Sequence, residues 1–168
     1  MSEICQESIF SAFFKKHVVS LRNFLIYKFG QTEQAEDLVQ DAFIKLWQNC
    51  ADVPIDKAKS YLYTLVNNAS LNVIAHEKVK LNYSNTHSNA EIEYKNPEYI
   101  LEEEQFKNQL LTAIERLNET QRVAFLMHRI DGKKYTEIAE ILNISVKAVE
   151  KRIHLALTEL RKEFKNFK

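Results

Sequence analysis

The chain has 168 residues, of which 45% are hydrophobic and 27% are charged, so it can bury a core and wholesale disorder is excluded. Only two glycines and two prolines interrupt it, which argues against sheets with tight turns and predicts an all-α protein with long helices. The 23 basic and 23 acidic residues cancel overall but not locally. Residues 132–168 are basic and residues 31–58 are acidic, which indicates two different partners.

The sequence shows no pattern of a reactive or membrane-bound protein. Cys5 and Cys50 are too few and too far apart for a metal site or a disulfide framework, and we expect reduced thiols in a cytoplasmic protein. There is no signal peptide or membrane-length apolar run, so we expect no membrane insertion. The five histidines lack metal-ligand spacing, and no nucleophile–base motif or phosphate-binding glycine loop is present. We therefore expect no metal, no cofactor and no enzymatic activity.

The first third of the chain predicts two helices. Apolar residues at helical spacing predict one over residues 6–29, which Gly30 ends. Thr32 is placed to cap the second, whose first turns carry acids that the helix dipole favours. Six residues of the second helix are expected to face the core: Leu38, Val39, Ala42, Phe43, Leu46 and Trp47.

The opposite face of this second helix is acidic and polar, with Asp37, Gln40, Asp41 and one apolar residue, Ile44. A single exposed apolar side chain is normal on a protein surface. The alternative is that this face contacts another protein.

A loop around Pro54 is predicted over residues 49–59, followed by an unusual helix over residues 60–75 that contains no charge. One side of it is apolar. The other side offers aromatic, hydroxyl and amide groups: Tyr61, Tyr63, Thr64, Asn67, Asn68 and Asn72. Uncharged amides and aromatics suit hydrogen bonding to bases and stacking on them, although a helix packed on both sides has the same composition.

Residues 81–96 lose periodicity and are rich in Asn and Ser, which predicts a flexible linker between helical domains at residues 1–80 and 97–168. Pro97 is well placed in the first turn of a helix. Leu101 and Phe106 are among the apolar residues whose spacing predicts this helix. Asn118 begins a capping-box-like start of the next helix, and Gly132 ends it.

The stretch from Tyr135 to His154 predicts two short helices joined by a tight turn. Asn143 is placed to adopt the left-handed conformation that ends a helix, and Ser145 is placed to cap the helix that follows. Residues with apolar side chains at helical spacing face inward on both helices: Ile138, Ile141, Leu142, Val149, Ile153 and Ala156. The pattern is typical of a DNA-binding helix-turn-helix, and the alternative is an ordinary helical hairpin with a solvated basic face. The outward residues are Lys147, Glu150, Lys151, Arg152 and His154.

Three stretches, in this order, resemble bacterial sigma factors of the extracytoplasmic-function group in the sigma-70 family. AEDLVQDAFIKLW, residues 35–47, resembles the polymerase-binding helix of region 2. YLYTLVNNASLN, residues 61–72, resembles the promoter-melting helix. Residues 117–160 resemble region 4. Together they cover nearly everything except the predicted linker.

The resemblance implies a protein that binds core RNA polymerase and promoter DNA, with an anti-sigma factor as a further candidate partner. It places Asp37, Gln40, Asp41 and Ile44 against the polymerase, and it implies that the loop at residues 49–60 holds a flipped-out base. It assigns two sets of residues to DNA. Those for the −10 element are Tyr61, Asn67, Asn68 and Asn72, and those for the −35 element are Lys147, Glu150, Lys151, Arg152 and His154.

The chain departs from the family at several of these positions. The family often has an acid at position 72, a basic residue at 67, and a basic pair at 75 and 76, so the melting helix is less positive here. Thr and Lys are frequent where Ala148 and Glu150 stand, which indicates an unusual −35 sequence. The alternative function is a helix-turn-helix regulator with a helical dimerisation domain that binds duplex DNA without polymerase.

Overall fold

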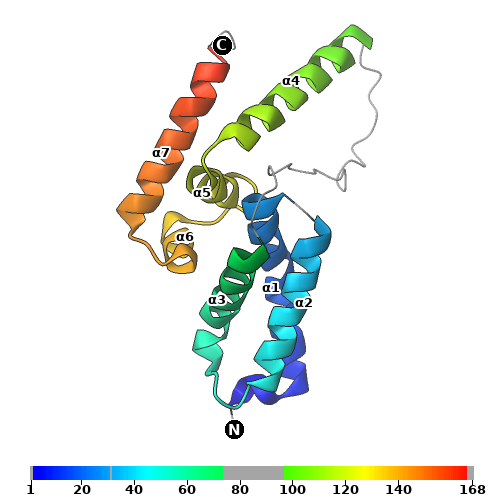
Figure 1. Cartoon of the computed structure of the whole chain (residues 1–168), viewed down its shortest axis with the longest axis vertical. Helices are drawn as coiled ribbons and strands as arrows, with labels where there is room; N and C mark the ends of the chain where they lie inside the picture. The colour runs from blue at the N-terminus through cyan, green and yellow to red at the C-terminus, as the bar shows by residue number, and fades with distance from the viewer. Residues whose placement is uncertain (1, 31, 74–96, 166–168) are drawn as a thin grey trace.

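The computed structural model describes residues 2–30, 32–73 and 97–165, and for residues 32, 72, 73 and 97–100 it describes the backbone alone. These residues form a 3₁₀-helix, η1 (Glu3–Cys5), and α-helices without any strand, so the predicted all-α fold is confirmed. Figure 1 shows two helical units, one above the other. The lower unit contains α1 (Glu7–Phe29), α2 (Thr32–Gln48) and α3 (Ile55–Val73). The upper unit contains α4 (Pro97–Arg116), α5 (Glu119–Arg129), α6 (Tyr135–Leu142) and α7 (Val146–Glu163).

The N-terminal unit is a three-helix bundle in which α2 packs against both α1 and α3. The turn between α1 and α2 depends on Gly30, whose φ of 71° is left-handed and confirms the predicted helix end. Fully buried side chains from all three helices form the core, including Leu21, Leu25, Leu46 and Val66. Because α1 and α2 form a hairpin, the start of α1 lies beside the end of α2, and η1 folds back there with Ile4 buried.

Three details of this unit differ from the sequence prediction. Helix α3 begins at Ile55 rather than at residue 60, because the Pro54 carbonyl accepts a hydrogen bond from Lys57 N at 2.9 Å and starts a helical turn. Trp47, predicted to face the core, is 43% exposed, and its ring contacts Phe10 with centroids 4.8 Å apart. Tyr63, predicted to lie on the polar face of α3, is buried instead.

Cys5 and Cys50 form a disulfide, so the prediction of reduced thiols is wrong for this structure. Their Cα atoms are 5.2 Å apart although 45 residues separate them in the chain. The hairpin of α1 and α2 explains this proximity, since it brings η1 to the residue that follows α2 by two positions.

Helices of the C-terminal unit begin or end at capping residues that the sequence predicted. Asn118 Oδ1 accepts a hydrogen bond from Thr120 N at 2.9 Å at the start of α5. Asn143 is left-handed, with φ 53° and ψ 49°, and Ser145 Oγ accepts from Ala148 N at 3.1 Å. The turn between α6 and α7 therefore has the geometry of a helix-turn-helix. The expected inward residues Ile138, Val149, Ile153 and Ala156 are buried.

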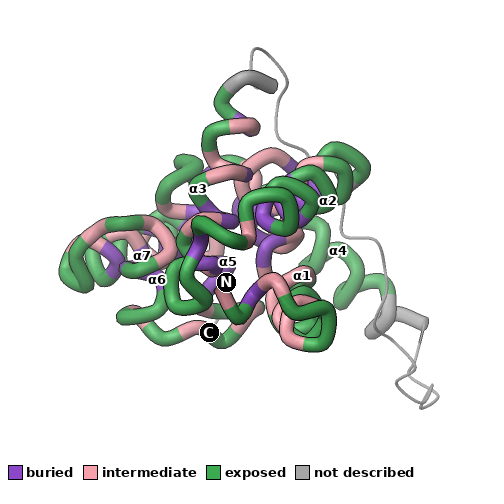
Figure 2. The backbone as a smooth tube through the Cα atoms, turned by 90° about the horizontal axis from the view of Figure 1, so that it is seen from below, coloured by how far each residue is buried: buried purple, intermediate pink, exposed green. Residues whose placement is uncertain are grey.

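Helix α4 is mostly exposed along its described residues, and only its last turns are buried (Figure 2). Leu101 is 58% exposed and Phe106 is 39% exposed, although both belong to the apolar pattern that predicts this helix. The predicted linker, residues 81–96, lies outside the described residues, and the proposed domain boundaries stay a prediction. The two units contact each other through α1 with α5 and through α3 with α6.

Candidate nucleic-acid interface

The outer face of α2 carries Asp37, Gln40, Asp41 and Ile44, and all four side chains are exposed. Ile44 is 54% exposed among these acids and amides. Phe14 and Trp47 are exposed nearby, at the seam between α1 and α2. The Phe14 ring contacts Phe43 with centroids 4.7 Å apart, and the Trp47 ring contacts Phe10 with centroids 4.8 Å apart. The predicted contact face is thus accessible and is wider and more aromatic than the sequence indicated.

A shallow hollow of about 530 Å³ lies in the predicted base-holding loop, and hollows of similar volume occur elsewhere on the described surface. Asn49 and Tyr61 line it, and Asn49 Nδ2 donates to Tyr61 Oη at 3.2 Å. The remaining lining groups are a carboxylate, a lysine, two hydroxyls and apolar residues: Asp52, Val53, Pro54, Lys57, Ser60 and Thr64. Hydrogen-bonding groups beside an aromatic ring can hold an unstacked base.

The amides of α3 have different surroundings. Asn68 is exposed, whereas Asn67 is half-buried and its Oδ1 accepts a hydrogen bond from Lys28 Nζ. The side chain of Asn72 lies outside the described residues. Tyr63 donates to or accepts from Ser20 Oγ at 3.1 Å, and burial raises its pKa to about 12. Tyr63 therefore belongs to the bundle core, and Asn68 is the described amide of α3 that is open to solvent.

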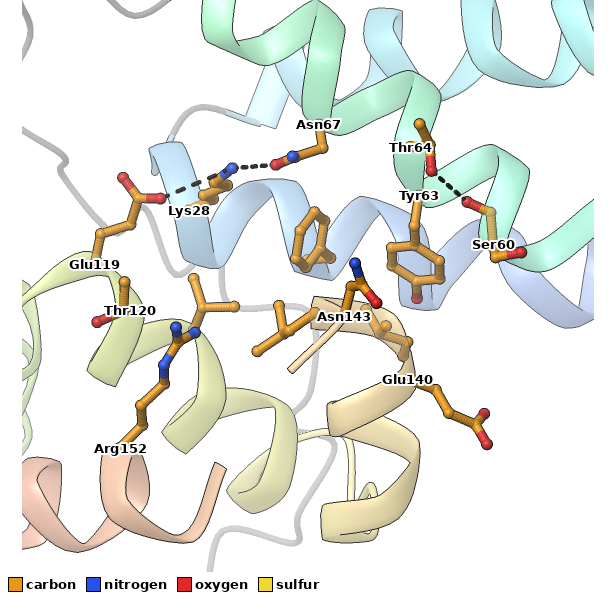
Figure 3. Close-up of a pocket in the computed structure, with 14 residues that line it drawn as sticks. Lys28, Ser60, Tyr63, Thr64, Asn67, Glu119, Thr120, Glu140, Asn143 and Arg152 are labelled. Atoms are coloured by element: carbon orange, nitrogen blue, oxygen red, sulfur yellow. Dashed lines mark hydrogen bonds and ion pairs between the residues drawn. The ribbon is translucent and has the colours of Figure 1, made fainter. Parts of the chain in front are cut away.

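A second cavity, of about 500 Å³, lies between the two units (Figure 3). Tyr63, Thr64 and Asn67 of α3 line one side, and Glu119, Asn143 and Arg152 of the C-terminal unit are among the residues of the other. Lys28 bridges the two sides, because its Nζ also lies 3.8 Å from Glu119 Oε1. Burial lowers the pKa of Lys28, and the neighbouring Glu119 carboxylate opposes this effect. The amide face of α3 is therefore partly covered by the helix-turn-helix unit.

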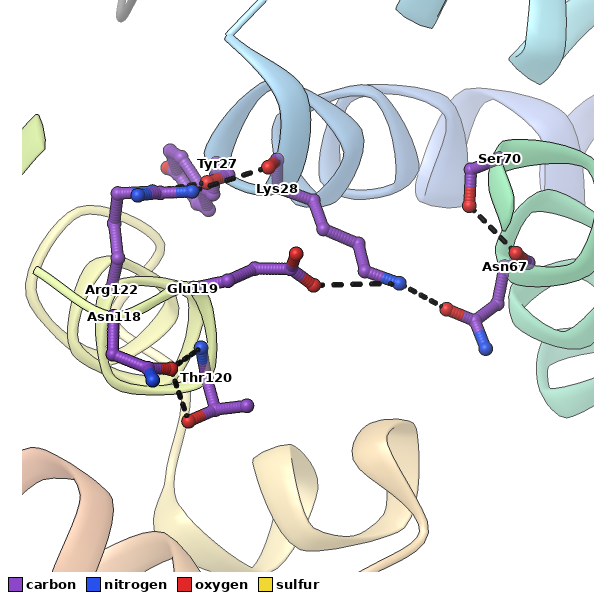
Figure 4. Close-up of polar contacts among 8 residues, drawn as sticks. All are labelled: Tyr27, Lys28, Asn67, Ser70, Asn118, Glu119, Thr120 and Arg122. Atoms are coloured by element: carbon purple, nitrogen blue, oxygen red, sulfur yellow. Dashed lines mark hydrogen bonds and ion pairs between the residues drawn. The ribbon is translucent and has the colours of Figure 1, made fainter. Parts of the chain in front are cut away.

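Arg122 donates hydrogen bonds across this contact between the units (Figure 4). Its side chain is 3% exposed, and its Nε and Nη2 donate to the carbonyls of Tyr27 and Lys28 at 2.8 and 3.2 Å. Its Nη1 donates to the Leu117 carbonyl at 3.1 Å. One guanidinium thus satisfies the last carbonyls of α1 and the carbonyl that follows α4, groups that a helix leaves unpaired at its C-terminus.

Asp131, just after α5, makes a second polar contact across the same interface. Its Oδ1 accepts hydrogen bonds from Tyr27 Oη at 2.8 Å and from Asn23 Nδ2 at 3.0 Å. Tyr27 is 4% exposed, so its hydroxyl donates to Asp131 from a buried position. Neither Arg122 nor Asp131 was predicted, because their partners lie about a hundred residues away in the chain.

The outer face of α7 remains open. Lys147, Glu150, Lys151 and His154 are exposed and surround a shallow hollow of about 480 Å³ beside Tyr135. Arg152 does not join them, because it is half-buried and lines the cavity between the units instead. On α7, the two cations Lys147 and Lys151 and the imidazole of His154 therefore share one surface with Glu150.

Neither a metal site nor a membrane span is found in the described ranges. No three metal-ligating side chains gather there, and no helix in those ranges is long and apolar enough to cross a bilayer.

Comparisons with known proteins agree with this arrangement. Residues 13–79 match the family model for Sigma-70 region 2, and residues 107–160 match that for Sigma-70 region 4. Two similar proteins of Bacillus subtilis are RNA polymerase sigma factor YlaC and ECF RNA polymerase sigma factor SigW. YlaC is 25% identical over 89% of this chain and 88% of its own, and SigW is 28% identical over 82% and 79%. The fold resembles the sigma factor RpoE of Bartonella quintana, solved in complex with the anti-sigma factor NepR, with a TM-score of 0.60, 20% identity, and coverage of 95% and 98% of the two chains.

Proposed function

The chain belongs to the sigma-70 family, in its extracytoplasmic-function group, and from this premise we propose that it binds core RNA polymerase and directs it to promoters by contacting −10 and −35 DNA. The observation that carries the proposal is the matching of regions 2 and 4 in their order onto two helical units whose outer faces differ in charge. The acidic face of α2 and the basic face of α7 suit two different partners, a protein and a duplex.

The α2 face is the proposed polymerase-binding surface. Asp37, Gln40 and Asp41 surround Ile44, whose exposed side chain supplies an apolar anchor within an acidic rim. Polar rims around a central apolar group are typical of specific protein interfaces. The domain at residues 1–80 carries this surface.

The −10 element is assigned to the same domain. The cavity beside Asn49 and Tyr61 offers a pocket for an unstacked base, and Asn68 offers an amide to the adjoining single strand. Unstacking a base costs a few kcal/mol, and contacts of this kind return part of that cost. Asn67 and Asn72 belong to the proposal as well, with Asn67 available after it leaves Lys28.

The −35 element is assigned to α7 in the domain at residues 97–168. Lys147 and Lys151 follow the N-terminus of a capped helix, where cations and free backbone N–H groups attract phosphates, and His154 lies on the same face. Glu150 lies among them, in a position to accept from a base amino group. Arg152 joins this set when the units separate.

We further infer that the protein works in the cytoplasm, where polymerase is found, and that it is not an enzyme. An anti-sigma factor is a proposed regulatory partner, supported by the complex of the structurally similar RpoE with NepR.

The test is binding to core polymerase by the double variant Asp41→Lys with Ile44→Glu. We expect at least a tenfold loss of affinity, because the change reverses a charge and removes the apolar anchor. The matched control is Glu7→Lys with Val19→Glu on α1, which has the same charge change and in which Val19 is also 54% exposed. Equal affinities of the two variants would contradict the assignment. Failure of the unmodified protein to bind core polymerase, with duplex binding intact, would instead favour a regulator that works without polymerase.

A further inference from the structure

The disulfide joins two segments beside the cavity of the 49–54 loop. Cys5 lies in η1, and Cys50 is the next residue after Asn49, which lines that cavity and donates hydrogen bonds to Lys45 O at 2.9 Å and to Tyr61 Oη at 3.2 Å. A second bond ties the same N-terminal segment to the loop, from Ser2 Oγ to the Val53 carbonyl at 2.8 Å. The N-terminal segment therefore braces the loop at both ends.

Both cysteines are half-buried rather than enclosed in the core, so solvent-borne reagents have access to this part of the fold. In compartments where polymerase works, thiols are kept reduced, and the disulfides that form there are usually transient and redox-sensing. A permanent structural bridge is therefore not expected in a protein with this function. Because the pair lies next to a predicted DNA pocket, its oxidation state can affect the order of that pocket.

We propose that Cys5 and Cys50 form a reversible redox switch that controls engagement of the −10 strand by the 49–54 loop. This inference rests on the proposed sigma-factor function. In the oxidised form the disulfide fixes Asn49 and Tyr61 around the cavity, and the pocket is ready for a base. In the reduced form the covalent link between η1 and the loop is absent, the Ser2 hydrogen bond and the packing of η1 remain, and the pocket loses part of its order.

The oxidant is a peroxide. One thiolate attacks a peroxide oxygen, the O–O bond breaks, and a sulfenic acid forms with release of water. The other thiolate then attacks the sulfenic sulfur, which forms the S–S bond and releases a second water once protons are counted. Two thiols lose two electrons and two protons, and hydrogen peroxide gains them. A small dithiol reverses the process by thiol–disulfide exchange.

The test uses holoenzyme assembled from the full chain and core polymerase, on a promoter that the holoenzyme has selected from a randomised library. The protein is treated with hydrogen peroxide or with dithiothreitol, its thiols are counted by alkylation and mass spectrometry, and −10 melting is followed by permanganate reactivity. We expect melting to be about five- to tenfold stronger in the oxidised form, with equal formation of holoenzyme in both forms. The Cys5→Ser/Cys50→Ser variant should melt at the reduced level whether or not peroxide is added.

Equal melting by the oxidised and reduced forms would overturn the switch, and so would a disulfide that dithiothreitol leaves intact in the native protein. Because these comparisons use the unmodified chain, they stand even if the serine variant folds poorly. Absence of holoenzyme in both redox forms would overturn the proposed function instead, which keeps the two failures apart.

Discussion

The two surfaces assigned to DNA are in opposite states. On α7, Lys147, Lys151 and His154 project into solvent, and the turn that positions them is held by local caps. On α3, the amide of Asn67 is occupied by Lys28, and a cavity shared with the C-terminal unit lies over it. Duplex DNA can therefore reach the first surface directly, whereas a single strand can reach all of the second only after intramolecular contacts break.

This difference follows from where the polar groups find partners. The backbone groups at the ends of α6 and α7 find hydrogen-bond partners within a few residues, so the outer face of α7 stays free to bind a ligand. The C-terminal end of α1 is satisfied across the interface by Arg122, Asp131 and Glu119, and Lys28 of α1 in turn donates to Asn67 of α3. Buried polar groups thus contribute to the contact between the units. Interfaces between domains of one chain are generally more polar than obligate ones, and relative motion of the domains is expected there.

The largest expected effect is from Arg122→Ala, which removes the guanidinium that caps α1 and supports the end of α4. Buried carbonyls would lose their donors, and we expect the free energy of unfolding to fall by roughly 3 kcal/mol. Urea denaturation measures this loss. Arg129→Ala, on the same helix but exposed, is the control and should change stability by less than about 0.5 kcal/mol. A loss below about 1 kcal/mol for Arg122→Ala would mean that the interface does not hold the units together.

Glu150→Lys probes the open surface. Within the described residues Glu150 takes part in no ion pair or hydrogen bond, so its carboxylate is available to a base. We expect the variant to prefer a different −35 sequence, with discrimination at one position changed by about 1–3 kcal/mol. Selection from randomised −35 elements measures this.

Lys151→Ala is the control for the Glu150 experiment, since loss of a phosphate contact weakens binding to all sequences and reduces the salt dependence. Arg152→Ala should weaken −35 binding less than Lys151→Ala, because Arg152 faces the cavity between the units. An unchanged preferred sequence in Glu150→Lys would leave Glu150 as a solvated residue.

Asn68→Ala tests the amide face of α3 at a residue that is exposed to solvent. Loss of one amide contact to the displaced strand should weaken open-complex formation about fivefold, equivalent to about 1 kcal/mol, while promoter recruitment stays nearly constant. Permanganate footprinting and mobility shift separate the two steps. Asn67→Ala should cost less, because Asn67 must first give up Lys28. Equal loss of recruitment and melting in Asn68→Ala would count against this assignment.

The features that the sequence predicted are the local ones. The left-handed turn at Asn143, the cap at Ser145 and the inward residues of α7 depend on neighbours within four positions, and the structure confirms them. The exposed α2 face around Ile44 follows from helical periodicity in the same way. Their assigned roles toward polymerase and DNA remain predictions.

The features that the sequence did not predict are the distant ones. Arg122 meets Tyr27 across 95 residues and Asp131 meets Asn23 across 108, and no periodicity encodes such pairs. Composition also misleads here, because an arginine is usually exposed and is buried only where acceptors are ready for it. The pairing of Cys5 with Cys50 was missed for the same reason, since the hairpin of α1 and α2 brings them together.

The smallest expected effect comes from His17 on α1, whose pKa is lowered to about 4 by burial and by Lys16, Lys59 and Lys133. Lys133 belongs to the C-terminal unit and Lys59 to α3, so the pKa of His17 depends on charges from both units. The unfolded chain binds a proton near pH 6.5, whereas the folded chain does not until about pH 4. The unfolded state therefore holds more protons between these values, and stability falls as the pH is lowered through this window.

We expect a loss of less than about 1 kcal/mol between pH 7 and pH 5.5, since solvent screens part of the lysine charges. Urea denaturation followed by the fluorescence of Trp47, the single tryptophan, measures it. His17→Gln should flatten the pH dependence in this range, because the uncharged amide does not titrate. Lys133→Gln should leave this slope nearly unchanged, because the proton that the unfolded chain binds near pH 6.5 sets it. The variant should instead raise the pKa of His17 in the folded protein slightly, by removing the charge that the C-terminal unit supplies, and titration of the His17 ring by NMR measures this. A folded His17 pKa that stays near 6.5 in the unmodified chain would contradict the burial of this side chain.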